Sequence, residues 1–178
     1  MIYVALLRGI NVGGRKKVAM ADLRALLAGL GFDDPRTLLQ SGNLVFGGRP
    51  RATTALERAI QEAARLRLGL ESEMFVRTAD EWHALVAANP FPAEARRDPG
   101  HLLAMCLHEA PAAPRVTALR AAIRGPERVE VRGREAYLVY PDGVGTSKLT
   151  HTILERHLGS GTARNWNTVL KLAAAVAT

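Results

Sequence analysis

Cysteine is almost absent from this chain, which has one residue of that type, Cys106, among 178. A single cysteine cannot form an intrachain disulfide, which fits a reducing compartment. Long apolar runs are also lacking, whereas a transmembrane helix needs about 20 consecutive apolar residues. The N-terminal apolar stretch is short and Arg8 follows it, while a signal peptide places its basic residues first. We therefore expect a cytoplasmic protein with no membrane partner.

Familiar catalytic and metal-binding patterns are missing as well. None of the five histidines falls in an H-E-x-x-H pattern or another common ligand spacing. The chain also lacks the G-x-S-x-G sequence that presents a nucleophilic serine. The sequence thus predicts no metal site and no cofactor, and it leaves both the catalytic residues and the existence of an enzymatic activity undetermined.

Acidic residues are scarce at the two ends of the chain, whose net charge as a whole is +7. Residues 1–20 hold four basic residues and no acid, and residues 143–178 hold four basic residues and one acid. The central part of the chain is neutral. The excess positive charge therefore lies in two segments, which favours a localised anion site over a general nucleic-acid coat.

What the chain does contain is a regular series of short strands and amphipathic helices. In the first half, apolar runs and helical spacings predict strands at 3–8, 36–40, 44–46 and 73–77, with helices at 20–30 and from 54 to Gly69. In the second half they predict strands at 101–107, 128–132, 135–140 and 161–164, with helices at 114–124, 147–158 and 165–176. This order indicates an α+β fold of two ferredoxin-like (β-α-β-β-α-β) halves in tandem, the second with an extra C-terminal helix.

The two halves are expected to span residues 1–77 and 78–178. Two capping boxes, Thr54 to Glu57 and Thr78 to Glu81, are predicted to open helices. The second of these helices should end near Asn89, because Pro90 follows it. Residues 89–100 are rich in proline and are expected to form a connecting loop.

Two glycine-rich loops are candidate anion sites. Residues 8–17, RGINVGGRKK, combine glycines that let backbone N–H groups converge with basic side chains. Residues 141–149, PDGVGTSKL, enter a helix but do not match the phosphate-binding loop G-x-x-x-x-G-K-[ST]. Each loop can also be read as ordinary turn chemistry, with Thr146 or Ser147 serving as a helix N-cap.

Two asparagine-containing turns complete the set of candidates. Asn165 is a suitable N-cap for the last helix, and Trp166 is expected in the core, which leaves Arg164 and Asn167 as ligand candidates. The Ser41-Gly42-Asn43 segment is typical of a tight turn, and antiparallel pairing would bring it beside the first glycine loop. The candidate ligand-binding residues are Arg8, Asn11, Gly13, Gly14, Lys16, Ser41, Asn43, Gly145, Ser147, Lys148, Arg164, Asn165 and Asn167.

Taken together, these segments resemble a known bacterial family. The motifs are RGINVGG at 8–14, QSGN at 40–43, NPF at 89–91, YPDG at 140–143, SKL at 147–149 and RNWNTV at 164–169. They are similar to those of the family called domain of unknown function 1697. The resemblance implies an α+β fold of two ferredoxin-like halves and implies no reaction.

The residues and the fold together favour a protein that binds a phosphate- or carboxylate-bearing small molecule between its two halves. Non-specific nucleic-acid binding along a basic face is the first alternative. Stacking of RNA bases on Tyr3 and Phe46 is disfavoured, because residues 39–46 do not match the RNA-binding signature of such sheets. The second alternative is a structural or interaction protein with no ligand. The sequence says nothing about the oligomeric state.

Overall fold

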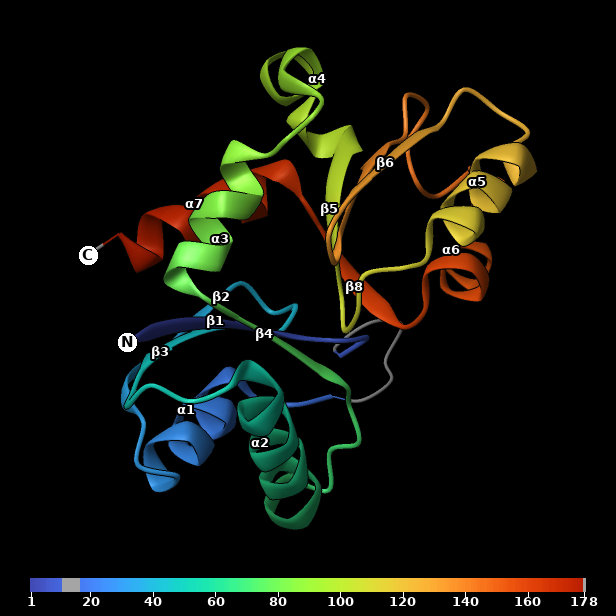
Figure 1. Ribbon diagram of the computed structural model, residues 1–178. Helices are drawn as coiled ribbons and strands as arrows, with labels where there is room; N and C mark the ends of the chain where they lie inside the picture. The colour runs from blue at the N-terminus through green and yellow to red at the C-terminus, as the bar shows by residue number, and fades with distance from the viewer. Residues whose placement is uncertain (11–16, 178) are drawn as a thin grey trace. The chain divides into compact units, whose positions relative to one another are not determined.

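The computed structural model describes residues 1–10 and 17–177, which form two compact units (Figure 1). The first unit contains Met1–Ala84 and Lys171–Thr178, and the second contains Leu85–Leu170. The last segment of the chain therefore folds with the first unit. The boundary expected between residues 77 and 78 separates the two β-α-β-β-α-β repeats, which is a different division from that into compact units. It stays a prediction.

The first unit is built on a four-stranded antiparallel sheet with the strand order β2-β3-β1-β4. Its strands and helices are β1 (Ile2–Leu7), α1 (Met20–Gly29), β2 (Asp33–Leu38), β3 (Asn43–Gly47), α2 (Thr53–Leu68), β4 (Met74–Thr78) and α3 (Ala79–Ala87). The β-α-β-β-α-β order and the antiparallel pairing of β1 with both β3 and β4 are those of a ferredoxin-like half.

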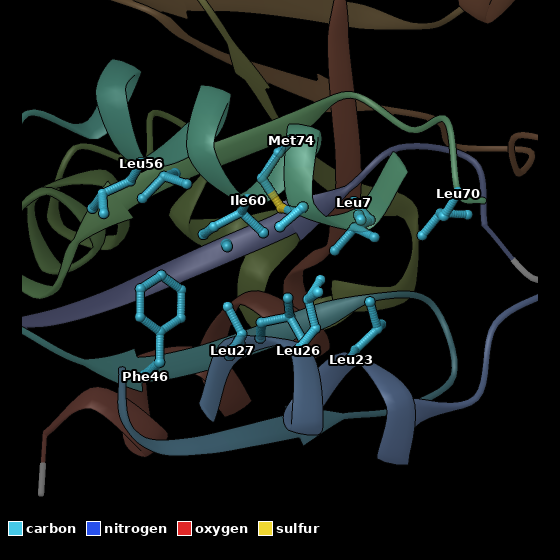
Figure 2. Packing of buried hydrophobic residues seen from close by; sticks show 14 of the residues in the cluster. Leu7, Leu23, Leu26, Leu27, Phe46, Leu56, Ile60, Leu70 and Met74 are labelled. Atoms are coloured by element: carbon cyan, nitrogen blue, oxygen red, sulfur yellow. The ribbon is translucent and has the colours of Figure 1, made fainter. Parts of the chain in front are cut away.

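The core of the first unit lies between this sheet and the helices α1 and α2. Leu23 and Leu27 of α1 and Leu56 and Ile60 of α2 recur at helical spacing and are fully buried (Figure 2). Tyr3 and Phe46 lie in the same core, with ring centroids 5.6 Å apart. Since both rings are buried, they are not available for stacking on RNA bases.

Side chains of α2 accept hydrogen bonds from backbone N–H groups of the edge strand β4. The Val76 N–H donates to Glu57 Oε1 at 2.9 Å, and the Met74 N–H donates to Gln61 Oε1 at 2.8 Å. The Glu57 carboxylate thus binds the backbone of β4. The predicted capping box at the start of α2 is wrong, because the N-cap is Ala52 and no side chain of the described residues caps the helix. By contrast, the box at the start of α3 is confirmed, because Thr78 Oγ1 accepts from the Glu81 N–H and Glu81 Oε2 accepts from the Thr78 N–H.

The second unit repeats this architecture with the strand order β6-β7-β5-β8. Its elements are α4 (Pro92–Arg97), the 3₁₀ helix η1 (Pro99–His101), β5 (Leu102–Leu107), α5 (Ala113–Ala122), β6 (Arg128–Arg132), β7 (Glu135–Val139), α6 (His151–Leu158), β8 (Gly161–Asn165) and the first part of α7 (Trp166–Val176), which belongs to the first unit from Lys171 onward. Helices α5 and α6 pack on one face of the sheet (Figure 1). Cys106 is buried in β5.

Two expectations for the second half need correction. Residues 89–100 are not a plain loop, because α4 and most of η1 form there, each with a proline in its first turn. Helix α6 begins at His151 rather than at 147, and its N-cap is Thr150, whose hydroxyl oxygen accepts from the Ile153 N–H. The C-terminal helix is confirmed, and α3 follows β4 in the first half as α7 follows β8 in the second.

Within the described parts of the chain, no helix has both the length and the apolar character that crossing a membrane would require.

Candidate functional site

Three segments of the first unit meet where β1 ends. Because β1 runs antiparallel to β3 and β4, its last residues lie beside the first residues of both neighbours. The Leu7 N–H donates to Gly42 O at 2.9 Å, and the Arg8 N–H donates to Glu73 O at 3.0 Å. The expected proximity of the Ser41-Gly42-Asn43 turn to the end of the first strand is therefore confirmed.

The turn between β2 and β3 is held by its own side chains. The Asn43 side-chain amide donates to Leu38 O at 2.8 Å and to Ser41 Oγ at 2.9 Å. Asn43 is also fully buried. These bonds give Asn43 a structural role, whereas Ser41 is exposed at the surface.

The side chain of Arg8 is fixed at this edge by residues that precede β4. Arg8 Nη1 lies 2.9 Å from Glu73 Oε1, and the two side chains keep about a third of their surface exposed. The Ser72 hydroxyl donates to Arg8 O at 2.7 Å. Arg8 is thus a partly exposed cation whose charge is balanced by a neighbouring carboxylate.

A hollow of about 950 Å³ opens beside Arg8, within the size range of small-molecule sites. It is lined by the end of β1, one face of α2 and the segment before β4: Arg8, Gly9, Arg58, Gln61, Glu62, Arg65, Leu70, Glu71, Ser72 and Glu73. A neighbouring hollow of about 470 Å³ shares Arg65, Leu70 and Glu71 with it and adds Lys17. The arrangement can accommodate a polar ligand against several charged groups.

A second ion pair lies on the α2 wall of this hollow. Arg65 donates to both carboxylate oxygens of Glu62, at 2.8 and 3.1 Å. These hydrogen bonds lower the pKa of Glu62 and raise the pKa of Arg65. Within the described residues, the Arg58 side chain has no hydrogen-bond or ion-pair partner, so it presents a guanidinium without a paired carboxylate to the hollow.

The sequence-based candidates did not include the α2 side of this hollow. Arg58, Gln61, Glu62 and Arg65 follow the spacing i, i+3, i+4 and i+7, which places them on one helix face. That pattern is visible in the sequence, but a polar stripe on a helix usually faces bulk water. Four other candidates, Asn11, Gly13, Gly14 and Lys16, lie outside the described residues.

In the second unit, the loop before α6 has a clear structural role at one position. The Ser147 hydroxyl donates to Glu127 Oε1 at 2.6 Å, and its oxygen accepts from the Leu149 N–H at 3.0 Å. Ser147 is therefore not the predicted N-cap but ties the loop to the segment before β6. Gly145 and Lys148 are exposed.

The turn into α7 also combines structural and exposed residues. Asn165 is the predicted N-cap, since its Oδ1 accepts from the Thr168 N–H at 3.1 Å, and Trp166 is buried as expected. Arg164 Nη1 donates to Thr162 Oγ1 and to Ala163 O, and burial lowers the pKa of Arg164 to about 10. Arg164 is still a cation at neutral pH, and Asn167 is exposed. The expectation that this turn and the loop before α6 contact the ligand stays a prediction.

The second unit has a smaller hollow, at the place in its fold that corresponds to the hollow of the first unit. It measures about 320 Å³ and lies where β5 ends, α5 begins, α6 ends and β8 begins. His108 follows β5 as Arg8 follows β1, and Ser160 precedes β8 as Glu73 precedes β4. The ion pair of the first hollow is therefore not repeated in the second.

No cluster of three or more metal-ligating side chains occurs in residues 1–10 and 17–177. The sequence patterns and the described side chains thus offer no preformed metal site.

Comparison with known proteins supports the fold and leaves the activity undefined. The conserved bacterial protein SP0830 from Streptococcus pneumoniae has a similar structure, with a TM-score of 0.75 and 23% sequence identity over 98% of both chains. No curated protein matches the sequence. The family model described as "Protein of unknown function (DUF1697)" matches residues 1–137. The motifs, the two ferredoxin-like halves and this match together show that the chain belongs to the DUF1697 family.

Proposed function

We propose that the protein binds a small molecule carrying a phosphate or carboxylate group in the hollow at the end of β1. The observation that carries the proposal is Arg58, an exposed cation on α2 that faces this hollow and has no ion-pair partner among the described residues. Arg8 can join it, because the Arg8–Glu73 pair keeps donor surface exposed. Arginine is well suited to this role, since its planar guanidinium can donate two parallel hydrogen bonds to either anion.

The charge balance of the lining favours a small ligand over nucleic acid. Among the described residues that line the hollow, three are arginines and three are glutamates. A nucleic-acid groove needs an excess of cations that tracks the phosphate backbone. A described lining in which arginines and glutamates are equal in number is better suited to a single anionic group placed on Arg58.

The test is a titration with ethyl phosphate and with butyrate, followed by amide NMR shifts. We expect saturable shifts at Gly9 and Ser72. Arg58→Gln should weaken binding by at least about threefold, since a charge-assisted hydrogen bond is lost. Glu73→Gln should strengthen binding, because it releases Arg8 from its carboxylate. Arg67→Gln is the matched control, since Arg67 is exposed on the same helix and does not line the hollow.

Three results would contradict the proposal. The first is that neither probe shifts the amides of the hollow, and the second is that Arg67→Gln weakens binding as much as Arg58→Gln does. Retention of the protein by an oligonucleotide that falls steeply with salt, unchanged in Arg58→Gln, would favour nucleic-acid binding elsewhere.

A further inference from the structure

The charged side chains of the hollow partly neutralise one another. In the part of the lining that the structure describes, the charged residues are Arg8, Arg58, Arg65, Glu62, Glu71 and Glu73. Arg8 pairs with Glu73 at 2.9 Å, and Arg65 pairs with Glu62 at 2.8 Å. Once these two pairs are set aside, one cation and one carboxylate are left, Arg58 and Glu71. Neither side chain has a hydrogen-bond or ion-pair partner in the parts of the chain that the structure describes.

The two remaining charges lie toward different ends of the hollow. Arg58 precedes Arg65 by two helical turns, which separates their Cα atoms by about 10 Å along α2. Glu71 follows the end of α2 and lines the neighbouring hollow together with Arg65 and Lys17. Glu71 is also close enough for its charge to help raise the pKa of Arg65. A ligand that satisfies both Arg58 and Glu71 must therefore carry two opposite charges with a spacer between them.

We infer that the ligand of this hollow is a zwitterion, with its phosphate or carboxylate on Arg58 and an ammonium group on Glu71. This inference rests on the proposed anion binding. It adds a positive charge on the ligand, separated by a spacer from the anionic group. Gln61 and Ser72 supply polar surface between the two ends. A simple anion would leave the Glu71 carboxylate unpaired beside it, and a simple amine would leave Arg58 unpaired.

A set of three probes of similar length tests the inference: 6-aminohexanoate, hexanoate and hexylamine. We expect 6-aminohexanoate to bind about two- to fivefold more tightly than hexanoate, the range of one partly exposed ion pair. Hexylamine should bind more weakly than the zwitterion. Glu71→Gln should remove the preference for 6-aminohexanoate without weakening hexanoate, and Arg58→Gln should weaken both carboxylates. Arg67→Gln should leave all three affinities unchanged.

The outcomes separate this inference from the function on which it rests. Equal or tighter binding of hexanoate overturns the zwitterion while leaving anion binding in place. A preference for 6-aminohexanoate that survives in Glu71→Gln also overturns it, because the ammonium group then lies elsewhere. If neither carboxylate nor ethyl phosphate shifts the amides of the hollow, the proposed function fails, and the zwitterion fails with it.

Discussion

Gly42 marks the closest approach between the β2–β3 turn and the end of β1. Its φ angle is +77°, in the left-handed region that favours glycine. A Cβ atom there would lie 2.6 Å from Ile10 Cδ1 and 2.9 Å from Leu7 Cβ. Since Gly42 O also accepts the Leu7 N–H, the turn cannot shift without losing that bond. This residue therefore holds the turn against the segment that leads into the hollow.

Gly42→Ala should lower the free energy of unfolding by about 2–5 kcal/mol, the sum of a left-handed backbone penalty and overpacking. Gly31→Ala is the matched control, because Gly31 has φ +82° but open space around its Cβ position. Urea unfolding of Gly31→Ala measures the backbone penalty alone, and the additional loss in Gly42→Ala measures the overpacking. Equal losses in the two variants would show that the contact with Ile10 and Leu7 is unimportant.

At this scale, local sequence indicated Arg8 but not its environment. The position of Arg8 after a buried strand and before glycines makes it a ligand candidate, and its side chain keeps about a third of its surface exposed. Its partner Glu73 lies 65 positions away, so no local pattern could show that the charge is balanced. Asn43 and Ser147 were likewise chosen as polar turn residues, and their hydrogen bonds show that they stabilise the loops themselves.

At the scale of elements, α2 and β4 are matched in spacing. Residues 57 and 61 are one helical turn apart, which is about 6 Å along the helix axis. Residues 74 and 76 are two positions apart on a strand, which is about 6.7 Å. The two acceptors of α2 can therefore reach two successive outward N–H groups of β4. These bonds occupy a strand edge that could otherwise pair with another chain.

Glu57→Ala should destabilise the fold by about 1–3 kcal/mol, because the Val76 N–H then loses its acceptor in a buried position. Glu57→Gln should cost less, since its side-chain oxygen can still accept. Hydrogen exchange of the Val76 amide reports the bond directly, and Leu44, on a central strand, provides an internal reference. Unchanged exchange at Val76 in Glu57→Ala would mean that the bond does not protect the strand.

The element order followed from the sequence, while several helix starts did not. Both capping boxes have a hydroxyl residue followed three positions later by glutamate, yet only Thr78 and Glu81 bond reciprocally. Glu57 lies beside a strand edge and bonds to it, and this tertiary competition is invisible in the local sequence. Residues 92–97 form a helix despite the nearby prolines, because a proline in the first turn lacks only an N–H that the helix does not use.

At the scale of the whole molecule, the chain returns to its first unit after the second is complete. Arg36 Nη2 of β2 donates to Ala175 O at 3.1 Å, and His83 Nε2 of α3 lies 3.3 Å from Ala173 O. Leu172 and Val176 are buried. These contacts tie the last turns of α7 to residues 1–84. Element order alone placed the whole of α7 in the second half, because it contains no information about such returns.

Leu172→Ala should cost about 2–5 kcal/mol, as expected for a fully buried leucine. The loss of hydrogen-exchange protection should be larger for β1 and β3 than for β5 and β7, since Leu172 belongs to the first unit. Leu170→Ala is the control on the same helix, because that side chain is 44% exposed and should change stability by less than about 0.5 kcal/mol. A uniform loss of hydrogen-exchange protection over both sheets would contradict the assignment of Leu172 to the first unit.

The return of residues 171–176 to the first unit also bears on how the protein is made. Ribosomes add roughly 5–20 residues per second, and the N-terminal part of a chain usually folds first. Here the first unit emerges early but lacks its last segment until all of Leu85–Leu170 has been synthesised. The first unit is thus begun before the second unit and completed after it, and during that interval it depends on α1, α2 and its own sheet to remain folded.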